Sequence, residues 1–348
     1  MTVRRQAPLK ELASALGLSV TTVSRALAGY PDVNPATRER VRAAVRDMGY
    51  PARRTARPPA SGRSDFVGMV LPVGGGLAID PLLGEFVAAL AEEFAQGGRS
   101  LFLATVTPGQ SDVEVLEHII DSGSADAFVI DRTEVDDLRV RYLLDRGFPF
   151  VTHGRLLHEE RRYVSFDTDG EAAFAEAARM LVDLGHRRFA LLTAAEPYTF
   201  AHLRRRGLSA VLAAAGLPLP DEAVIAVSLA DPSLARGAAA RLLALDPRPT
   251  AIVCVADVLA LAVLDAARRA GIAVPDALSV IGFDDLPAAA YSEPPLSTFD
   301  PRMRESAQTV AHMVAHVLER GVGQVESRLM EPRFVARGSH GPAPPDTP

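Results

Sequence analysis

Apolar residues between positions 9 and 49 recur at the spacing of a helix face, and this pattern predicts three short helices. Gly17 follows the first helix and can take the left-handed conformation that a tight turn needs. Ser19 is placed to cap the second helix, because its hydroxyl can accept a hydrogen bond from a free amide. Asn34 followed by Pro35 is typical of the start of a third helix. The N-terminal segment is therefore predicted to be a small all-α unit.

From Phe66 onward the pattern changes, and short apolar runs alternate with amphipathic stretches in two blocks, one before and one after Tyr163. Such alternation is typical of parallel sheets with helices on both faces. Two blocks indicate two similar lobes, so the predicted fold class is α/β: a small all-α head, then a two-lobed body with two parallel sheets. A further helix is predicted over 303–319 and a last strand over 328–335, and the Gly/Pro-rich tail from Gly338 predicts disorder. The predicted strands are FVGMVL, LFLATV, AFVI and FPFVT in the first block, and YVSF, RFALLTA, AVIAVSL, AIVCVA and LSVIGF in the second.

Charge is distributed unevenly along the chain. Residues 1–63 carry 12 basic and 4 acidic side chains, a net charge of +8, whereas the remainder carries 25 basic and 39 acidic ones, a net charge of −14. A basic head on an acidic body suggests that the head binds nucleic acid. From charge alone, a solvated charged surface is the alternative.

The single cysteine, Cys254, excludes an intrachain disulfide and a multi-thiolate zinc site, which favours a reducing compartment. The basic N-terminal segment lacks the apolar stretch of a secretory signal. No apolar run reaches the roughly 18–20 residues of a membrane helix. We therefore expect a soluble, cytoplasmic protein with no membrane partner.

Ala13, Gly17, Leu18 and Val23 stand where a helix-turn-helix motif needs a small residue, a glycine turn and apolar residues that hold the second helix. The exposed face of that second helix then carries short hydroxyls, a valine and an arginine. Hydroxyls can approach phosphates, a valine methyl can contact a thymine methyl, and arginine can bind guanine O6 and N7. From the spacing alone, an ordinary helical hairpin is the alternative. The side chains on this face are Val20, Thr21, Thr22, Ser24 and Arg25.

The segment LASALGLSVTTVSRALAGYPDVNPATRERVRAAVRDMGY resembles the DNA-binding head of the LacI/GalR family of bacterial transcription regulators. It is close to the family pattern VSxxTVSRxLxG, followed by V(N/S)xxTRxRVxxAxxxxGY. The resemblance continues through the body in GxVLP, in CxxDxxALxxL from Cys254 onward, and in SVIGFDD followed by PPLST. It covers almost the whole chain and implies a helix-turn-helix head joined to a periplasmic-binding-protein-like effector domain.

The resemblance also implies roles for individual residues of the head. Val20, Thr21 and Arg25 fall on base-reading positions, and the Val20–Thr21 pair falls where the family varies to choose operators. Arg38 is expected either to reach a phosphate or to lie in solvent. The positions that contact the DNA backbone or fix the helix are Thr22 and Ser24.

Two departures from the family pattern concern the hinge and the first cap. The family's hinge helix carries a leucine that wedges into the minor groove, but here that position is Pro59, preceded by Pro58, with Ala56 and Arg57 before them. Two prolines do not continue a helix, although proline can itself act as a wedge, so both outcomes are open for this hinge. Pro8 stands where the family usually has a Ser or Thr cap.

In a two-lobed α/β body, ligands bind between the lobes at the carboxyl ends of strands. Polar residues follow several predicted strands here, together with a phenylalanine and arginines at the start of one helix. They suit a polyhydroxylated sugar, because Asp accepts from paired hydroxyls, Arg donates two bonds in a plane and Phe covers the apolar sugar face. A capping or surface role is the alternative for each residue. The resemblance favours Arg204 and Asp257, and it shows Gly154 where the family often has Asp. The candidate effector residues are Arg132, His153, Arg155, Phe200, Arg204, Asp257 and Asp284.

These observations together predict a ligand-responsive, sequence-specific DNA-binding regulator, a repressor of a carbohydrate-utilisation operon. It would read a palindromic operator as a homodimer, and a small sugar-like effector between the lobes would modulate operator affinity. The alternative is a sugar-binding protein without DNA-binding activity. The expected domains are a helix-turn-helix head at 1–50, a hinge at 51–63, an effector domain at 64–340 (lobe 1 at 64–161 and 292–322, lobe 2 at 162–291 and 323–338) and a disordered tail at 341–348.

We expect no cofactor, no metal and no enzymatic activity. The sequence contains no GxGxxG, GxxxxGK[ST] or GxSxG motif. His312 and His316 are spaced as a possible metal-binding pair on one helix, but no third ligand is apparent from the sequence. A solvated or packed pair of histidines is therefore the preferred interpretation.

Overall fold

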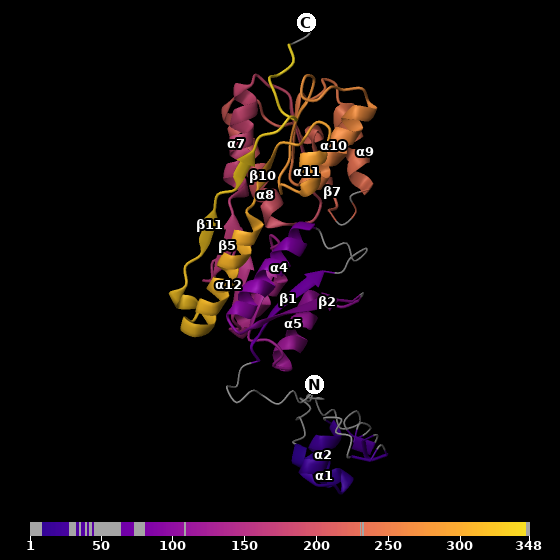
Figure 1. The fold of residues 1–348 in the computed structure, drawn as a ribbon, viewed down its shortest axis with the longest axis vertical. Helices are drawn as coiled ribbons and strands as arrows, with labels where there is room; N and C mark the ends of the chain where they lie inside the picture. Colours follow the sequence, from indigo (N-terminus) through magenta and orange to yellow (C-terminus); the bar gives the residue numbers. More distant parts are fainter. Residues whose placement is uncertain are drawn as a thin grey trace. The chain divides into compact units, whose positions relative to one another are not determined.

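The computed structural model describes residues 9–27, 33–34, 36–38, 40–41, 44, 64–72, 81–107, 109–229, 231 and 233–345. They belong to two units, Met1–Ser64 with His118–Ser124 and Asp65–Glu117 with Ala125 onward; the N-terminal head and the body that follows it from Asp65 are each described by themselves (Figure 1). Among these residues, no helix combines the length and the apolar character needed to cross a membrane.

The head begins with α1 (Leu9–Leu16) and α2 (Val20–Leu27). Gly17 joins the two helices with a φ of 64°, the left-handed conformation expected for this turn. The Ser19 hydroxyl accepts a hydrogen bond from the Thr22 amide at 3.0 Å. The predicted turn and the predicted cap of α2 are therefore both confirmed.

Helical residues also follow Asn34, whose side-chain oxygen accepts a hydrogen bond from the Ala36 amide at 2.8 Å. This cap agrees with the predicted start of a third helix. The apolar side chains of the head converge on one small core, as the helical spacing predicted. Its buried members are Leu12, Ala13, Val23, Ala26, Val33 and Val41.

The first lobe of the body is built on a parallel sheet. Its strands are β1 (Phe66–Pro72), β2 (Ser100–Val106), β3 (Ala127–Asp131), β4 (Phe150–His153), β5 (Ser165–Thr168) and β11 (Arg328–Met330), and its helices are α4 (Pro81–Gln96), α5 (Asp112–Asp121), α6 (Leu138–Arg146) and α12 (Met303–Arg320), followed by η2 (Val322–Gln324). The strand order is β11-β5-β4-β3-β1-β2, and every neighbouring pair is parallel. Helices α4 and α12 pack on each other and on the sheet, burying Phe86, Leu90 and Val310. Burial of such side chains is the main favourable contribution to folding of this lobe.

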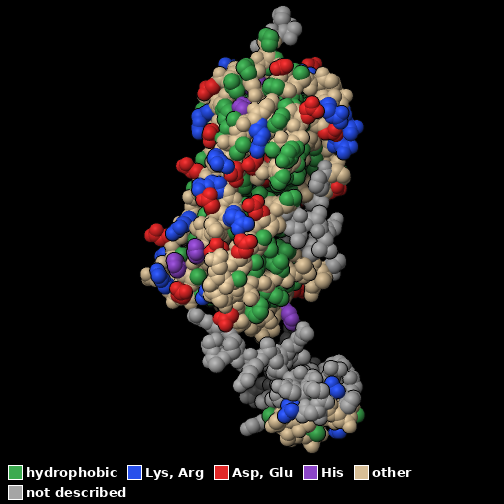
Figure 2. Space-filling view, viewed as in Figure 1, with side chains coloured by type: hydrophobic (Ala, Val, Ile, Leu, Met, Phe, Trp, Pro, Cys, Tyr) green, Lys and Arg blue, Asp and Glu red, His purple; other side chains and the backbone are tan. Residues whose placement is uncertain are grey.

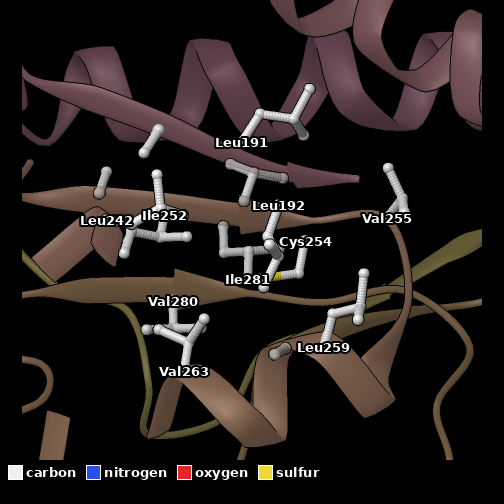
Figure 3. Packing of buried hydrophobic residues seen from close by; sticks show 14 of the residues in the cluster. Leu191, Leu192, Leu242, Ile252, Cys254, Val255, Leu259, Val263, Val280 and Ile281 are labelled. Carbon is white, nitrogen blue, oxygen red and sulfur yellow. The ribbon is translucent and has the colours of Figure 1, made fainter. Parts of the chain in front are cut away.

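The second lobe is built on a smaller parallel sheet. Its strands are β6 (Phe189–Ala194), β7 (Val224–Val227), β8 (Ala251–Cys254) and β9 (Ser279–Ile281), and its helices are α7 (Gly170–Asp183), α8 (Thr199–Ala214), η1 (Asp221–Ala223), α9 (Ser233–Leu243), α10 (Asp257–Arg269) and α11 (Pro287–Tyr291). The strand order is β7-β6-β8-β9. Figure 3 shows aliphatic side chains such as Leu191, Ile252 and Val263 packed between the strands and the helices on either face. Cys254 lies in this core, as its apolar strand predicted.

The chain passes between the lobes at places that differ from the predicted boundaries. Residues 162–168 and 323–330 were expected in lobe 2, but β5 pairs with β4 and β11 pairs with β5, so both complete the first sheet. Residues 292–300 were expected in lobe 1, but Leu296 and Phe299 belong to the core of the second. The reason is that hydrogen bonding and burial decide which lobe a segment joins, and neither can be deduced from the pattern of apolar residues alone.

The predicted single strand over 328–335 is in fact two strands. After β11 the chain passes through Glu331 and Pro332 and then forms β12 (Arg333–Val335), which pairs antiparallel with β10 (Thr298–Asp300). Proline has no amide to donate to a ladder, so a break in the strand at this position is expected.

The prediction of disorder from Gly338 onward is wrong for the residues that the structure describes, which extend to 345. Ser339 is completely buried, and its hydroxyl donates to the Val280 carbonyl at 2.6 Å. The Gly341 amide donates to Ser279 at 3.0 Å, and the Ala343 amide donates to the Leu184 carbonyl at 2.8 Å. Backbone and hydroxyl groups of the tail thus find fixed partners in the second lobe, which composition alone could not indicate.

Candidate functional site

The outer face of α2 carries the side chains that the sequence assigned to base reading. Val20 is 40% exposed, and Thr21 and Arg25 are exposed, whereas Val23 and Ala26 on the opposite face are buried. An isolated, exposed valine beside a threonine and an arginine is available for contact with a partner. The helix therefore has one face that holds the head together and one face whose side chains are exposed.

The remaining head residues differ in how they are held. Thr22 is half-buried, and its hydroxyl lies 2.8 Å from that of Ser19, so it helps to fix the start of α2. Arg38 is half-buried, and its Nε has no hydrogen-bond partner among the described residues. The side chain of Ser24 and the hinge residues Ala56, Arg57 and Pro59 lie outside the described residues.

Figure 2 shows acidic and basic side chains interspersed over the displayed face of the body. The negative charge of the body is therefore not gathered into one acidic area on this face. Candidate chemistry has to be sought at the strand ends, where the two sheets present polar residues.

In the first lobe, Asp131 and His153 end neighbouring strands and stand opposite each other in the β3–β4 register. His153 Nδ1 lies 2.8 Å from Asp131 Oδ1, and the imidazole stacks on the ring of Phe86 with centroids 4.4 Å apart. Burial alone would raise the pKa of Asp131, but the hydrogen bond and charge of His153 outweigh it, and the pKa is lowered. The pair presents an ionised carboxylate and an aromatic surface at the end of the sheet.

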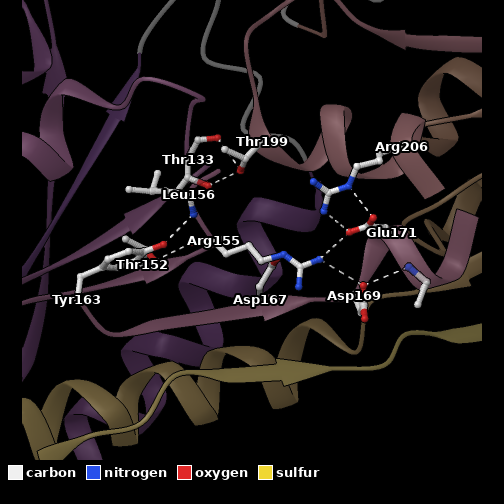
Figure 4. A network of polar contacts seen from close by, with 12 residues as sticks. Thr133, Thr152, Arg155, Leu156, Tyr163, Asp167, Asp169, Glu171, Thr199 and Arg206 are labelled. Atoms are coloured by element: carbon white, nitrogen blue, oxygen red, sulfur yellow. Dashed lines mark hydrogen bonds and ion pairs between the residues drawn. The ribbon is translucent and has the colours of Figure 1, made fainter. Parts of the chain in front are cut away.

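Arg155 lies in a network of charged groups shown in Figure 4. Its guanidinium lies 3.2 Å from Asp167, 3.4 Å from Asp169 and 3.5 Å from Glu171. Glu171 also accepts two hydrogen bonds from Arg206, at 2.6 and 2.5 Å, and these bonds lower its pKa. Because Glu171 belongs to α7 of the second lobe, Arg155 bridges the lobes.

Arg204, on α8, is held among aromatic rings in the second lobe. Its guanidinium carbon lies 3.5 Å from the ring centroid of Phe283 and 4.7 Å from that of Phe200, and the group donates to the Val255 carbonyl. Burial lowers the pKa of Arg204 to about 10, so it remains charged at neutral pH. Its Nε has no hydrogen-bond partner among the described residues. Phe200 and Arg204 are thus brought together as predicted, forming a stacked cation–aromatic unit.

Asp257, by contrast, is turned into the second lobe. It is completely buried, and its two carboxylate oxygens accept hydrogen bonds from the Leu286 amide at 2.9 Å and the Thr298 hydroxyl at 2.6 Å. Burial raises its pKa to about 6. Both oxygens bond to the protein itself and the side chain has no exposed surface, so Asp257 holds the loops around it in place.

Asp284 and Asp285 follow β9 with φ values of 125° and 48°, which non-glycine residues rarely adopt. Strain of this kind persists only where the surrounding structure enforces it, and it is concentrated at functional sites. Asp284 lines a cavity of about 290 Å³ that also has Leu82 and Glu85 of α4 in its wall. The cavity therefore takes its lining from both lobes.

Two further charged side chains, Arg132 and Asp167, lie at the ends of strands in the first lobe. Arg132, at a φ of 50°, interacts with Tyr198 across the lobes. Asp167 is buried, and among the described residues its Oδ2 makes the ion pair with Arg155 but no hydrogen bond; burial raises its pKa to about 6. Sequence reasoning did not choose Asp167, although its position directly after an apolar strand was the available signal.

A small helical head whose second helix has an exposed polar face, joined to a two-lobed body with polar groups at its strand ends, is the architecture of a ligand-regulated DNA-binding protein. Comparison with known proteins agrees. Residues 8–52 match the model of bacterial regulatory proteins of the lacI family, and residues 178–340 match that of the periplasmic binding protein-like domain.

Relatives match along nearly the whole chain. The HTH-type transcriptional regulator AglR of Rhizobium meliloti (strain 1021) is 38% identical over 344 residues, covering 98% of this chain and 96% of its own. The structure of a transcriptional regulator CelR–cellobiose complex is 26% identical, with a TM-score of 0.72 over 96% of this chain and 100% of its own. The structure of the lac repressor dimer bound to operator and an anti-inducer is 23% identical and shares the fold, with a TM-score of 0.70 over 96% of this chain and 99% of its own. The chain belongs to the lacI family of bacterial transcription regulators.

Proposed function

We propose that this chain is a cytoplasmic repressor that binds a palindromic operator as a homodimer through Val20, Thr21 and Arg25. The observation that carries this proposal is the division of α2 into a buried face and an exposed face. In this proposal Thr22, Ser24 and Arg38 support the contact with the DNA backbone, and Ala56, Arg57 and Pro59, which lie outside the described residues, are assigned to contact with the minor groove. A single head buries little surface on DNA, so two heads are needed for tight binding.

The effector in this proposal is a small sugar held between the lobes. Arg204 and Phe200 supply a planar donor and an aromatic face, and Asp284, which follows β9, supplies an acceptor. His153 and Arg132 approach from the first lobe. Arg155 and Asp257 act as positioning residues, since their polar groups are already engaged by the protein.

The relatives support a sugar as effector and a non-enzymatic role. One of them is described in complex with cellobiose, and another is described as a dimer on its operator. Sugar recognition needs no covalent step, so the chemistry at the strand ends is that of hydrogen bonding and stacking.

Operator binding in the presence and absence of a sugar tests the proposal. The full chain should select one palindrome from a pool of random duplexes, and the logarithm of its affinity should fall linearly with the logarithm of salt concentration. Cellobiose and other disaccharides should raise the melting temperature of the protein and change its affinity for that palindrome. Binding of the sugar without salt-dependent DNA binding would instead favour a sugar-binding protein that does not regulate transcription.

A further inference from the structure

Two loops from different lobes are joined by backbone hydrogen bonds. The Thr199 amide in the second lobe donates to the Thr133 carbonyl in the first at 2.8 Å, and the Val135 amide donates back to the Pro197 carbonyl at 2.9 Å. This is a short antiparallel bridge between the loop after β3 and the loop after β6. The lobes are therefore connected here by main-chain atoms as well as by the strands that cross between them.

The side chains of the same two threonines reinforce the bridge. Thr133 and Thr199 are 1% and 2% exposed. The Thr199 hydroxyl donates to the Thr133 carbonyl at 3.1 Å, so the Thr133 hydroxyl donates to Thr199 Oγ1 across 2.6 Å (Figure 4). Helix α8 has no side-chain cap at Tyr198, and the carbonyl of Thr133 takes that place. The first lobe thereby supplies the N-terminal acceptor of a helix in the second.

A glycine in the next loop leaves room for this arrangement. Gly154 has a φ of 119°, and a Cβ built on it would overlap with Thr133 Oγ1. The absence of a side chain at Gly154 therefore leaves space for the Thr133 hydroxyl that takes part in the bridge.

We propose that Thr133 and Thr199 form an inter-lobe clasp that exists without effector and positions the effector residues on either side of it. Arg132 directly precedes Thr133, Phe200 directly follows Thr199, and Arg204 lies one turn further along α8. Opening the clasp frees the first turn of α8 and shifts these residues together. The clasp is inferred from the hydrogen bonds of the structure alone, whereas its influence on effector binding rests on the proposed function above.

Hydrogen exchange of the full chain without any sugar tests the clasp directly. Thr199→Val removes the hydroxyl at constant shape and leaves the Thr133 hydroxyl without its buried acceptor. We expect exchange to become about tenfold faster in peptides covering 133–136 and the first turn of α8, while Thr199→Ser exchanges as the wild type does. Thr250→Val is the matched control, because Thr250 is equally buried and bonds only within the second lobe, to His186 and the Arg188 carbonyl.

Unchanged exchange at 133–136 in Thr199→Val would overturn the clasp, as would equal acceleration there in the Thr250→Val control. Acceleration at 133–136 without any in the first turn of α8 would overturn the positioning role. Calorimetric titration with cellobiose adds a second measurement, in which Thr199→Val should bind at least several-fold more weakly than Thr199→Ser. A wild-type chain that does not bind cellobiose would count against that sugar as effector, while the exchange result would still decide the clasp.

Discussion

Replacing Asp257 with asparagine tests how the second lobe accommodates a carboxylate in its interior. Asparagine has nearly the same shape as aspartate. Its carbonyl oxygen can accept from the Leu286 amide, and its amino group can donate to the Thr298 hydroxyl, which can serve as an acceptor. The substitution therefore removes a buried charge and keeps a partner for both neighbours, so its effect on stability isolates the cost of the charge.

The magnitude follows from the pKa of Asp257, which burial raises to about 6 from 3.8. Because the folded state holds this proton more tightly than the unfolded state, the wild-type free energy of unfolding falls as pH rises from about 4 to about 6, and the full penalty is present above pH 6. Each pKa unit corresponds to about 1.4 kcal/mol. The free energy of unfolding of the D257N variant is therefore expected to exceed that of the wild type by about 3 kcal/mol at pH 7.5 and by about 1 kcal/mol at pH 4.5.

Urea unfolding of the full chain, followed by far-ultraviolet circular dichroism at the two pH values, measures this difference. The D145N variant is the control for general loss of a negative charge, because the Asp145 side chain is 70% exposed in an ion pair with Arg161; it should leave stability nearly unchanged. A D257N variant that is less stable than the wild type at pH 7.5, or that differs by the same amount at both pH values, would refute the reasoning.

Three further predictions concern the head and the packing of the second lobe. Arg25→Ala should lower the discrimination between operator and unrelated duplex by about 1–3 kcal/mol in fluorescence-anisotropy titrations, with the melting of the body unchanged; an unaltered operator preference would contradict the role of α2. Ser19→Ala removes the acceptor of the Thr22 amide and should destabilise the head by about 1 kcal/mol, seen as faster amide exchange in α2 but not in β6. Gly207→Ala forces a Cβ onto the Glu171 carbonyl where α7 and α8 cross, and should lower the free energy of unfolding by about 1–3 kcal/mol or more. An unchanged melting temperature would show that the two helices can move apart there at little cost.

The alternation of apolar runs and amphipathic stretches in the body was sufficient to predict the two parallel sheets, because strands buried on both faces are continuous apolar runs in the sequence. The same pattern located the strand ends, and with them His153, Phe200 and Arg204. Their positions follow from local sequence order once neighbouring strands are parallel. Residues close to the ends of adjacent strands are brought together by the sheet itself.

The role of Asp257 could not be predicted in the same way. The sequence places it after a strand, where it could face a ligand or the protein interior. What decides between these is the pair of donors at Leu286 and Thr298, which are distant along the chain and reach Asp257 only after β9 and β10 have formed. The crossing point at β11 escaped prediction for the same reason, since β11 joins its sheet through β5, which lies far earlier in the sequence.

The order in which segments emerge during synthesis bears on how this body folds. The first sheet needs β11 (Arg328–Met330) and the covering helix α12, while β10 needs β12 (Arg333–Val335) as its partner and β9 of the second sheet bonds to the buried Ser339. A ribosome therefore has to translate past residue 330 before either lobe can complete its hydrogen bonds, whereas the buried core residues of the head that the structure describes lie within the first 41. Nascent chains would carry a finished head and an unfinished body for most of translation, with apolar strands exposed to chaperones and to one another until the final segments arrive.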